Sequence, residues 1–208
     1  MKRRDLLKGA GLAAAGSGLA LAGCSQGEPS IAATPATTID EPVRNWKMVT
    51  AWPVGFPGLG TAAADLAALI TRASAGRIKV RVYGAGELVP AFEVFDAVSR
   101  GTAEMGHAAA YYWGGKSPAA AFFCTVPFGL TAMEMNGWLY YGGGLELWRE
   151  LYAQFGLVPF PAGNTGVQMA GWFKREINSV ADLAGLKMRI PGLGGEVMSK
   201  LGATPVNL

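Results

Sequence analysis

The residues best suited to hold a ligand are Arg189 and the glycines that follow it at 192, 194 and 195. Arginine presents a planar, permanently charged fork that binds a carboxylate through two parallel hydrogen bonds. A glycine-rich turn brings backbone N–H groups close to a ligand, and a helix that starts after the turn points its positive end there. The pattern favours a small carboxylate. A solvated arginine before an ordinary turn is the alternative, and these residues alone leave both open.

The segment around Arg189 predicts a strand, a turn and a helix. Apolar residues at 186, 188 and 190 alternate with Lys187 and Arg189, which is typical of a strand. Pro191 should end that strand because proline cannot donate to a ladder. The Gly192–Gly195 run is then expected to be the turn. A capping box at Ser179 and Asp182 predicts a one-turn helix before the strand, and a similar box at Thr131 and Glu134 predicts the start of an earlier helix. A helix over 196–201 and a strand from 204 should follow the turn.

The chain before this segment alternates between strand and helix patterns, which predicts an α/β fold with parallel strands. The expected strands cover 46–52, 77–83, 103–109, 157–160 and 167–173, and the expected helices cover 61–74, 91–100, 131–141 and 145–155. Ligands of open α/β sheets bind beyond the carboxyl ends of the strands. The aromatic residues Tyr111, Tyr112 and Trp113 are therefore candidates for a pocket wall. Core packing is favoured for Trp113, and ligand contact is slightly favoured for Tyr112.

The first 45 residues predict targeting rather than a folded domain. Arg3 and Arg4, followed by Leu-Leu-Lys, resemble a twin-arginine export motif within a signal peptide over 1–23. The mildly apolar stretch after it has about 14 residues, fewer than a membrane-spanning helix needs. Leu-Ala-Gly before Cys24 resembles a lipobox, which predicts acylation of Cys24. Residues 24–45 then form a lipidated, disordered tether that places the body of the protein on the periplasmic side.

Charge and cysteine content exclude several classes of site. The formal charge of +3 comes from the signal peptide, since residues 24–208 contain 14 basic and 14 acidic residues. No basic excess remains to favour nucleic acid as a partner. Cys124 lies in an apolar run and is expected to be a buried structural thiol, and His107 is expected to be packed or hydrogen-bonded. One histidine and one remaining cysteine cannot form a zinc site of the Cys/His kind.

Three stretches together resemble the solute-binding proteins of tripartite ATP-independent periplasmic (TRAP) transporters. They are the export signal, the first strand WKMVTAW and residues 179–192, SVADLAGLKMRIPG. Residues 163–173 and 192–195 are similar to the branch of that family that binds 2-oxo acids and lactate. The resemblance implies a two-lobed α/β clamp, of the type II-like periplasmic binding fold, that closes on an organic anion and performs no reaction. The first lobe would cover 46–163, and the second would begin at 164–208.

The resemblance also implies residue roles and partners. Arg189 would bind the carboxylate, Tyr112 would reach the ligand from the first lobe, and Gln168 would contact both the substrate and a Na+ or Ca2+ ion. Without the resemblance, Gln168 would be read as an ordinary strand residue. The ligand would be a monocarboxylate such as pyruvate or lactate, delivered to membrane permease subunits. A homodimer is possible for a full-length member.

Length separates this sequence from that family. In the family, the second lobe continues well past the position of Leu208 and supplies acidic cation ligands and a long hinge helix. The chain is therefore expected to be a nearly complete first lobe with a truncated second lobe, and a non-functional remnant is an alternative. A nucleotide-binding enzyme is a weaker alternative, because the third glycine of a dinucleotide fingerprint would fall at Val197 and no nucleophile–base pair is visible.

Overall fold

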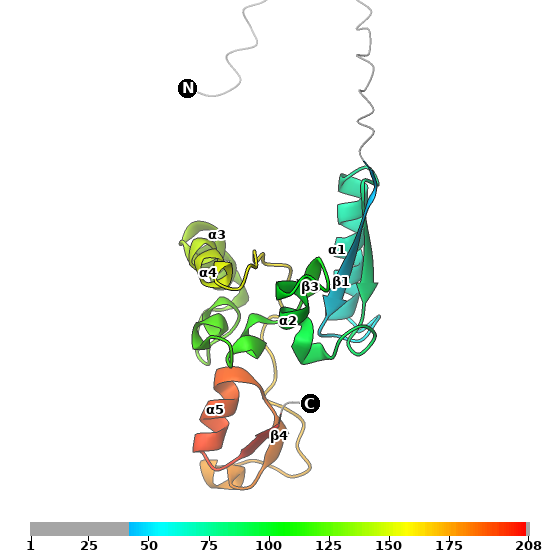
Figure 1. Cartoon of the computed structure of the whole chain (residues 1–208). Helices are drawn as coiled ribbons and strands as arrows, with labels where there is room; N and C mark the ends of the chain where they lie inside the picture. The colour runs from blue at the N-terminus through cyan, green and yellow to red at the C-terminus, as the bar shows by residue number, and fades with distance from the viewer. Residues whose placement is uncertain (1–41, 207–208) are drawn as a thin grey trace, which may run out of the picture. The chain divides into compact units, whose positions relative to one another are not determined.

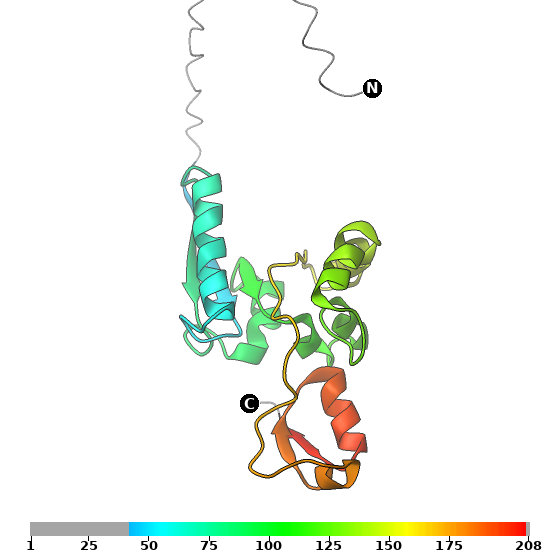
Figure 2. The same ribbon diagram turned by 180° about the vertical axis from the view of Figure 1, so that it is seen from behind.

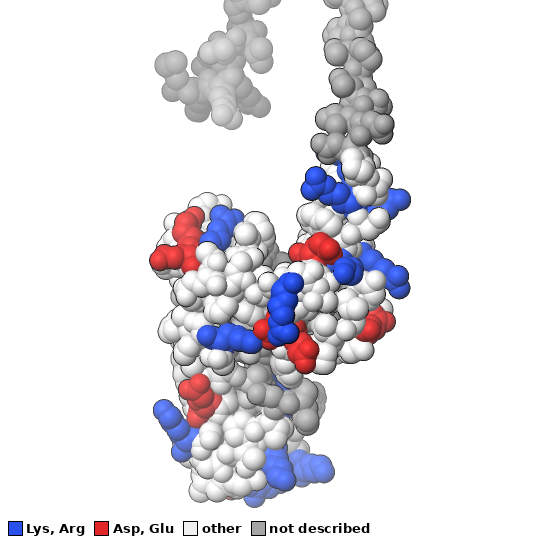
Figure 3. Space-filling model, viewed as in Figure 1, with Lys and Arg blue, Asp and Glu red and all other residues white. Residues whose placement is uncertain are grey.

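The structure, a computed structural model, describes residues 42–206. The predicted export motif at Arg3 and Arg4 and the predicted lipidation site Cys24 lie outside the described residues. In the part of the chain that is described, no helix combines the length and the apolar character needed to cross a bilayer. Figure 3 shows acidic and basic side chains in several small groups over the visible face, some of mixed charge and some basic only.

The first sheet contains three parallel strands in the order β2-β1-β3 (Figure 1). These strands are β1 (Arg44–Thr50), β2 (Ile78–Tyr83) and β3 (Met105–His107). Helix α1 (Leu59–Ala73) joins β1 to β2 and lies against the sheet through the small residues Ala63 and Ala67. Small side chains allow this close approach, and Met48 is nearly fully buried beneath them. The predicted strand–helix–strand unit with parallel pairing is confirmed.

Two short helices and several aromatic rings cover the other part of the core. The helices are η2 (Ala91–Glu93) and α2 (Val94–Ser99), where one helix over 91–100 was expected. Phe95 is buried and lies 5.4 Å from the ring of Trp113 and 5.1 Å from that of Phe155, centroid to centroid. Trp113 is itself buried, so its predicted role in core packing is confirmed.

The next part of the chain is helical and packs around one aromatic stack. Its elements are η3 (Ala110–Trp113), η4 (Pro118–Phe123), α3 (Ala132–Tyr141) and α4 (Gly144–Ala153). The predicted capping box at Thr131 and Glu134 opens α3. Between α3 and α4 the chain reverses at Gly143, whose φ of 83° favours glycine. Phe123 is stacked between Trp138 and Trp148, at centroid distances of 5.7 and 5.6 Å.

The last part of the described chain forms a second, two-stranded parallel sheet. It contains η5 (Val180–Leu183), β4 (Lys187–Arg189), α5 (Gly192–Lys200) and β5 (Thr204–Val206). The predicted capping box of Ser179 and Asp182 is present at η5. The predicted alternation in β4 is also confirmed, because Lys187 and Arg189 are exposed and Met188 is partly buried. Strands and helices thus alternate as an α/β fold requires.

Three predictions about local structure are wrong. Residues 157–160 and 167–173 form no strand, and Figure 2 shows the chain from the end of α4 to η5 without helix or strand. Pro159 removes a donor from the first stretch and Pro161 directly follows it. In the second stretch Val167 and Trp172 are more than 90% exposed, with no paired strand beside them. The third error concerns α5, which begins at Gly192 rather than Glu196, so the glycines form its first turn instead of preceding it.

Candidate functional site

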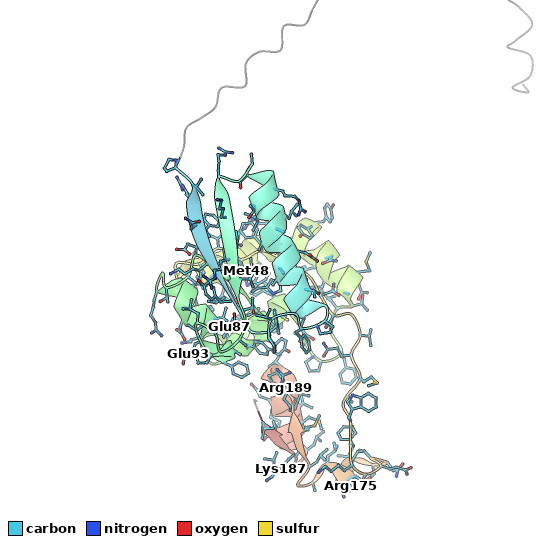
Figure 4. The ribbon with its side chains drawn as sticks, turned by 90° about the vertical axis from the view of Figure 1, so that its right-hand side faces the viewer. Met48, Glu87, Glu93, Arg175, Lys187 and Arg189 are labelled. Carbon is cyan, nitrogen blue, oxygen red and sulfur yellow. The ribbon has the colours of Figure 1, made fainter. Side chains whose placement is uncertain are left out.

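The centre of the candidate site is a contact between Arg189 and Tyr112. Arg189 Nη2 donates a hydrogen bond of 3.0 Å to the Tyr112 hydroxyl, and the guanidinium carbon lies 5.7 Å from the centroid of the Tyr112 ring. Figure 4 shows Arg189 on the side of its segment nearest to Glu87 and Glu93, whereas Lys187 and Arg175 lie on the far side. The structure therefore brings together two of the three residues that the sequence predicted for ligand binding.

Tyr112 is held in place by a group of aromatic rings. It lies in η3, directly after β3, at the carboxyl end of the first sheet. The centroid of its ring is 4.7 Å from that of Tyr111, 5.1 Å from Phe92, 6.0 Å from Trp113 and 6.1 Å from Trp52. The contact with Phe92 is edge-to-face, an arrangement that aromatic rings favour. The rings hold Tyr112 so that its hydroxyl accepts the hydrogen bond from Arg189.

The start of α5 lies against the same aromatic group. Gly192 has a φ of 64°, and a Cβ atom placed on it would come within 3.1 Å of Tyr111 Cδ2. Glycine suits this position because a side chain would be strained at that φ and would press on the Tyr111 ring. Gly192 therefore serves the docking of α5 on η3. That is a different role from the ligand-cradling turn expected from the sequence.

The electrostatics of the pair suit an anion. Partial burial lowers the pKa of the Arg189 guanidinium, but the hydrogen bond to Tyr112 and the adjacent phenols outweigh it and leave that pKa above its usual value. Burial raises the pKa of Tyr111 above its usual range, and the neighbouring Tyr112 adds to this effect. The site thus presents one permanent positive charge next to a neutral Tyr111, and a carboxylate complements that charge.

Trp52 and His107 lie behind Tyr112, and the sequence patterns did not single them out as site residues. Trp52 Nε1 donates a hydrogen bond of 2.7 Å to His107 Nδ1, and both side chains are buried. Burial lowers the pKa of His107, and its buried Nε2 makes no hydrogen bond within the described part of the chain. The expected packed, hydrogen-bonded histidine is confirmed. The sequence signal that could have identified Trp52 and His107 is their position at the carboxyl ends of β1 and β3.

Gln168 is not joined to the Arg189–Tyr112 pair in the described part of the chain. Its side chain is exposed, and Nε2 donates a hydrogen bond of 2.6 Å to Thr165 Oγ1. In the same loop, Asn164 Oδ1 accepts a hydrogen bond from the Gly166 N–H. Because the amide nitrogen of Gln168 faces Thr165, Oε1 is the atom that could ligate a hard cation. Over residues 42–206 no three His, Cys, Asp or Glu side chains gather into a metal site.

Cys124 lies at the end of η4 and forms no disulfide with any residue that the structure describes. Burial raises the pKa of its thiol, so the thiol stays protonated at neutral pH. A protonated, largely buried thiol is a poor nucleophile. The structural role expected for Cys124 fits this environment.

Comparisons with known proteins point to one family. Residues 48–208 match the model of the bacterial extracellular solute-binding protein family 7. A curated relative is 50% identical over 202 residues, which cover 97% of this chain and 53% of the relative. It is a monocarboxylate 2-oxoacid-binding periplasmic protein of Nostoc sp. strain PCC 7120. The chain thus spans about half the length of the curated relative it matches.

Two solved structures with the same fold are equally similar in sequence. A TRAP periplasmic solute-binding protein of Pseudoalteromonas atlantica, with bound sodium and pyruvate, is 50% identical with a TM-score of 0.77; the match covers 80% of this chain and 50% of that one. A TRAP periplasmic solute-binding protein of Colwellia psychrerythraea, with bound calcium and pyruvate, is 49% identical with a TM-score of 0.77. The match covers 80% of this chain and 51% of that one. These likenesses confirm the predicted α/β solute-binding-protein fold.

Proposed function

The chain belongs to the bacterial extracellular solute-binding protein family 7, and we propose that it binds a small monocarboxylate for a TRAP transporter. The ligand class is a 2-oxo acid such as pyruvate, or lactate. The relatives from Nostoc, Pseudoalteromonas and Colwellia support this class, since their names or structures give a 2-oxo acid or pyruvate as ligand. The family consists of binding proteins, and the proposed role involves no chemical reaction.

The observation that carries the proposal is the hydrogen bond from Arg189 to Tyr112. A guanidinium has five N–H donors, and the Tyr112 hydroxyl takes one of them. Enough donors remain for two parallel bonds to a carboxylate. Tyr112 fixes the plane of the guanidinium before the ligand arrives, which lowers the entropy lost on binding. We therefore assign the carboxylate to Arg189 and a neighbouring ligand contact to Tyr112.

A Na+ or Ca2+ ion is the cofactor we propose, with Gln168 as one ligand. An amide oxygen is a hard ligand that suits both ions. Gln168 lies in a loop with Asn164 and Thr165, whose side-chain oxygens are of the same hard type. When bound, the cation would supply positive charge that complements an anionic ligand. The bound sodium and calcium of the two solved relatives support this proposal.

We further propose that residues 46–163 form most of one lobe and that residues 164–208 begin a second. The two separate parallel sheets, β2-β1-β3 and β4-β5, support this division. Arg189 then comes from one lobe and Tyr112 from the other. A carboxylate bound between them would stabilise the closed arrangement of the clamp. Homodimer formation by a full-length protein is a further expectation, which light scattering would test.

The N-terminal residues would decide where the protein works. We propose twin-arginine export through Arg3 and Arg4, followed by cleavage before Cys24 and acylation of its sulfur. Lipid would then hold the protein at the membrane on the periplasmic side, next to its permease subunits. Cys24→Ser should release the protein into the soluble periplasmic fraction, and Arg3→Lys with Arg4→Lys should leave the precursor in the cytoplasm. A Cys24→Ser protein that stays with the membrane would contradict lipidation.

The test of the proposed function is direct binding by the full-length gene product. Titration calorimetry with pyruvate, lactate and a longer 2-oxo acid, each with Na+ or with Ca2+, should give saturable binding of at least one acid. The same acid should raise the unfolding midpoint, because it binds only the native state. Succinate, a dicarboxylate, is the control and should bind far more weakly. If none of the monocarboxylates binds with either cation, the proposed function is wrong.

A further inference from the structure

We propose that His107 is a positioning residue for the binding site. Through the Trp52 indole it fixes the ring of Tyr112, and through Tyr112 the guanidinium of Arg189, in the orientation that receives a carboxylate. The ligand in this statement rests on the proposed function, but the chain of contacts does not. It runs over four side chains, from the interior of the first sheet to the strand-end arginine of the second.

The main chain around Trp52 is fixed before its side chain is considered. Thr50 of β1 pairs with His107 of β3, and Ala51 N–H donates to the His107 carbonyl at 3.0 Å. The Trp52 carbonyl accepts hydrogen bonds of 2.8 Å from both Thr50 Oγ1 and Ala85 N–H. What remains free is the rotation of the indole about its two side-chain torsions.

The hydrogen bond to His107 removes that freedom. Trp52 Nε1 lies 2.7 Å from His107 Nδ1, and the two rings meet edge-on with a centroid distance of 6.0 Å. An indole N–H can only donate, and a buried donor without an acceptor is costly. Any rotamer that turns the indole away from His107 is therefore disfavoured. The acceptor must be a neutral imidazole with its lone pair on Nδ1, and burial favours that neutral form.

The fixed indole in turn limits where the Tyr112 ring can lie. Trp52 packs against Tyr112 at 6.1 Å with an interplanar angle of 52°, and Phe92 contacts the same ring edge-on at 5.1 Å. The Tyr112 hydroxyl is then placed 3.0 Å from Arg189 Nη2. If the indole rotated, Tyr112 would lose one of its flanking rings, and its hydroxyl would no longer be held at Arg189. His107 therefore acts on the site without touching the ligand.

A purely structural histidine would have a different signature. Its removal would lower stability but leave the affinity of the folded protein unchanged. Two substitutions separate these cases. His107→Leu fills a similar space and removes the acceptor, whereas His107→Asn can place its Oδ1 near the position of Nδ1 and keep accepting from Trp52. Affinity is measured well below the unfolding midpoint of each variant, so that loss of folded protein does not contribute.

We expect His107→Leu to raise the dissociation constant for pyruvate about tenfold, and His107→Asn to return it to within about threefold of the parent value. In a Trp52→Phe background, which lacks the donor, His107→Leu should have no further effect on affinity. Unchanged pyruvate affinity in folded His107→Leu would overturn the proposal. So would equal losses in the Leu and Asn variants.

Spectroscopy tests the contacts without any ligand. With tyrosine labelled for NMR, the ring signals of Tyr112 should shift in His107→Leu and return in His107→Asn, and the indole N–H signal of Trp52 should follow the same pattern. Should His107→Leu fail to fold, His107→Ala, which also lacks the acceptor, takes its place in the comparison with His107→Asn. Ring signals that stay in place in the folded variants would overturn the proposal. If the parent binds no acid while these signals move as expected, the proposed function fails and the positioning role stands.

Discussion

Arg189 Nη2 and the Tyr112 hydroxyl lie 3.0 Å apart, although 77 residues separate them in the sequence. Gly192 makes a second approach to the same short helix, against Tyr111. These two contacts place a strand-end arginine of one sheet at the carboxyl end of the other sheet. The relationship gives the candidate site its charge and its aromatic wall.

Tyr112→Phe should weaken pyruvate binding several-fold. The change removes the acceptor of the Arg189 hydrogen bond and keeps the ring contacts with Phe92 and Trp52, so the loss should be about 1 kcal/mol, as for one such bond. Titration calorimetry measures it. Tyr140→Phe is the matched control, because its hydroxyl is on the exposed side of α3 and its removal should change nothing. Equal affinities of Tyr112→Phe and the parent would remove the Tyr112 hydroxyl from the site.

Arg189→Lys should lose more than Tyr112→Phe, in spite of the retained charge. An ammonium group is a point charge without the planar fork, so one of the two carboxylate bonds is lost. We expect pyruvate affinity to fall at least about tenfold, or about 1.4 kcal/mol, and to fall below detection in Arg189→Ala. Lys187→Ala, on the same strand but at the far side of its segment in Figure 4, is the control. Tight binding by Arg189→Ala would show that another group holds the carboxylate.

Gln168→Ala should change how pyruvate binding depends on added Na+ or Ca2+. If Gln168 Oε1 ligates the cation, its removal weakens cation binding. Because the cation supports the ligand, pyruvate binding weakens as well. The measurement is a series of pyruvate titrations over increasing cation concentration. Gln154→Ala removes an exposed amide from the end of α4 and serves as control. A cation dependence that is the same in Gln168→Ala and the parent would exclude Gln168 as a ligand.

The stability of the fold should fall in mild acid because of His107. Burial holds the pKa of His107 below its usual value of 6.5, so the unfolded chain takes up this proton first as the pH falls. Above about pH 6.5, His107 therefore does not change the free energy of unfolding. As the pH falls below 6.5, His107 lowers the free energy of unfolding. Urea unfolding of parent and His107→Asn between about pH 7.5 and pH 5 measures the effect. As the pH decreases, the parent should lose more stability than His107→Asn. Parallel pH profiles would mean that His107 is not held neutral.

Two glycines should respond in opposite ways to alanine. Gly192→Ala forces an alanine into a φ of 64° and against Tyr111, which should destabilise the chain by about 1 kcal/mol or more. Gly137 lies exposed inside α3 with open space around its Cα, so Gly137→Ala should stabilise by about 0.5–1 kcal/mol. Chemical denaturation gives both values. A neutral Gly192→Ala would mean that α5 does not depend on this close approach.

Much of the local structure could be read from the sequence because its signals are short-range. The alternation at Lys187 and Arg189, the capping boxes at Thr131 and Ser179, and the strand–helix–strand unit at the start all depend on neighbouring residues. The predicted start of helix α5 at 196 is four residues too late. A run of glycines is typical of a turn, and the packing of Gly192 against Tyr111 has no local sequence signal. The strands expected over 157–160 and 167–173 were wrong because a strand also needs a partner edge, which no local pattern supplies.

The amino-acid types supply the groups available for binding: one arginine at a strand end, an amide at 168 and aromatic residues after the third strand. Which of these groups meet depends on the tertiary structure. It joined Arg189 to Tyr112, seated Gly192 on Tyr111, and placed Trp52 and His107 behind the pair. The physical reason is that such contacts arise from the packing of elements distant in the chain, and their geometry depends on every side chain between them.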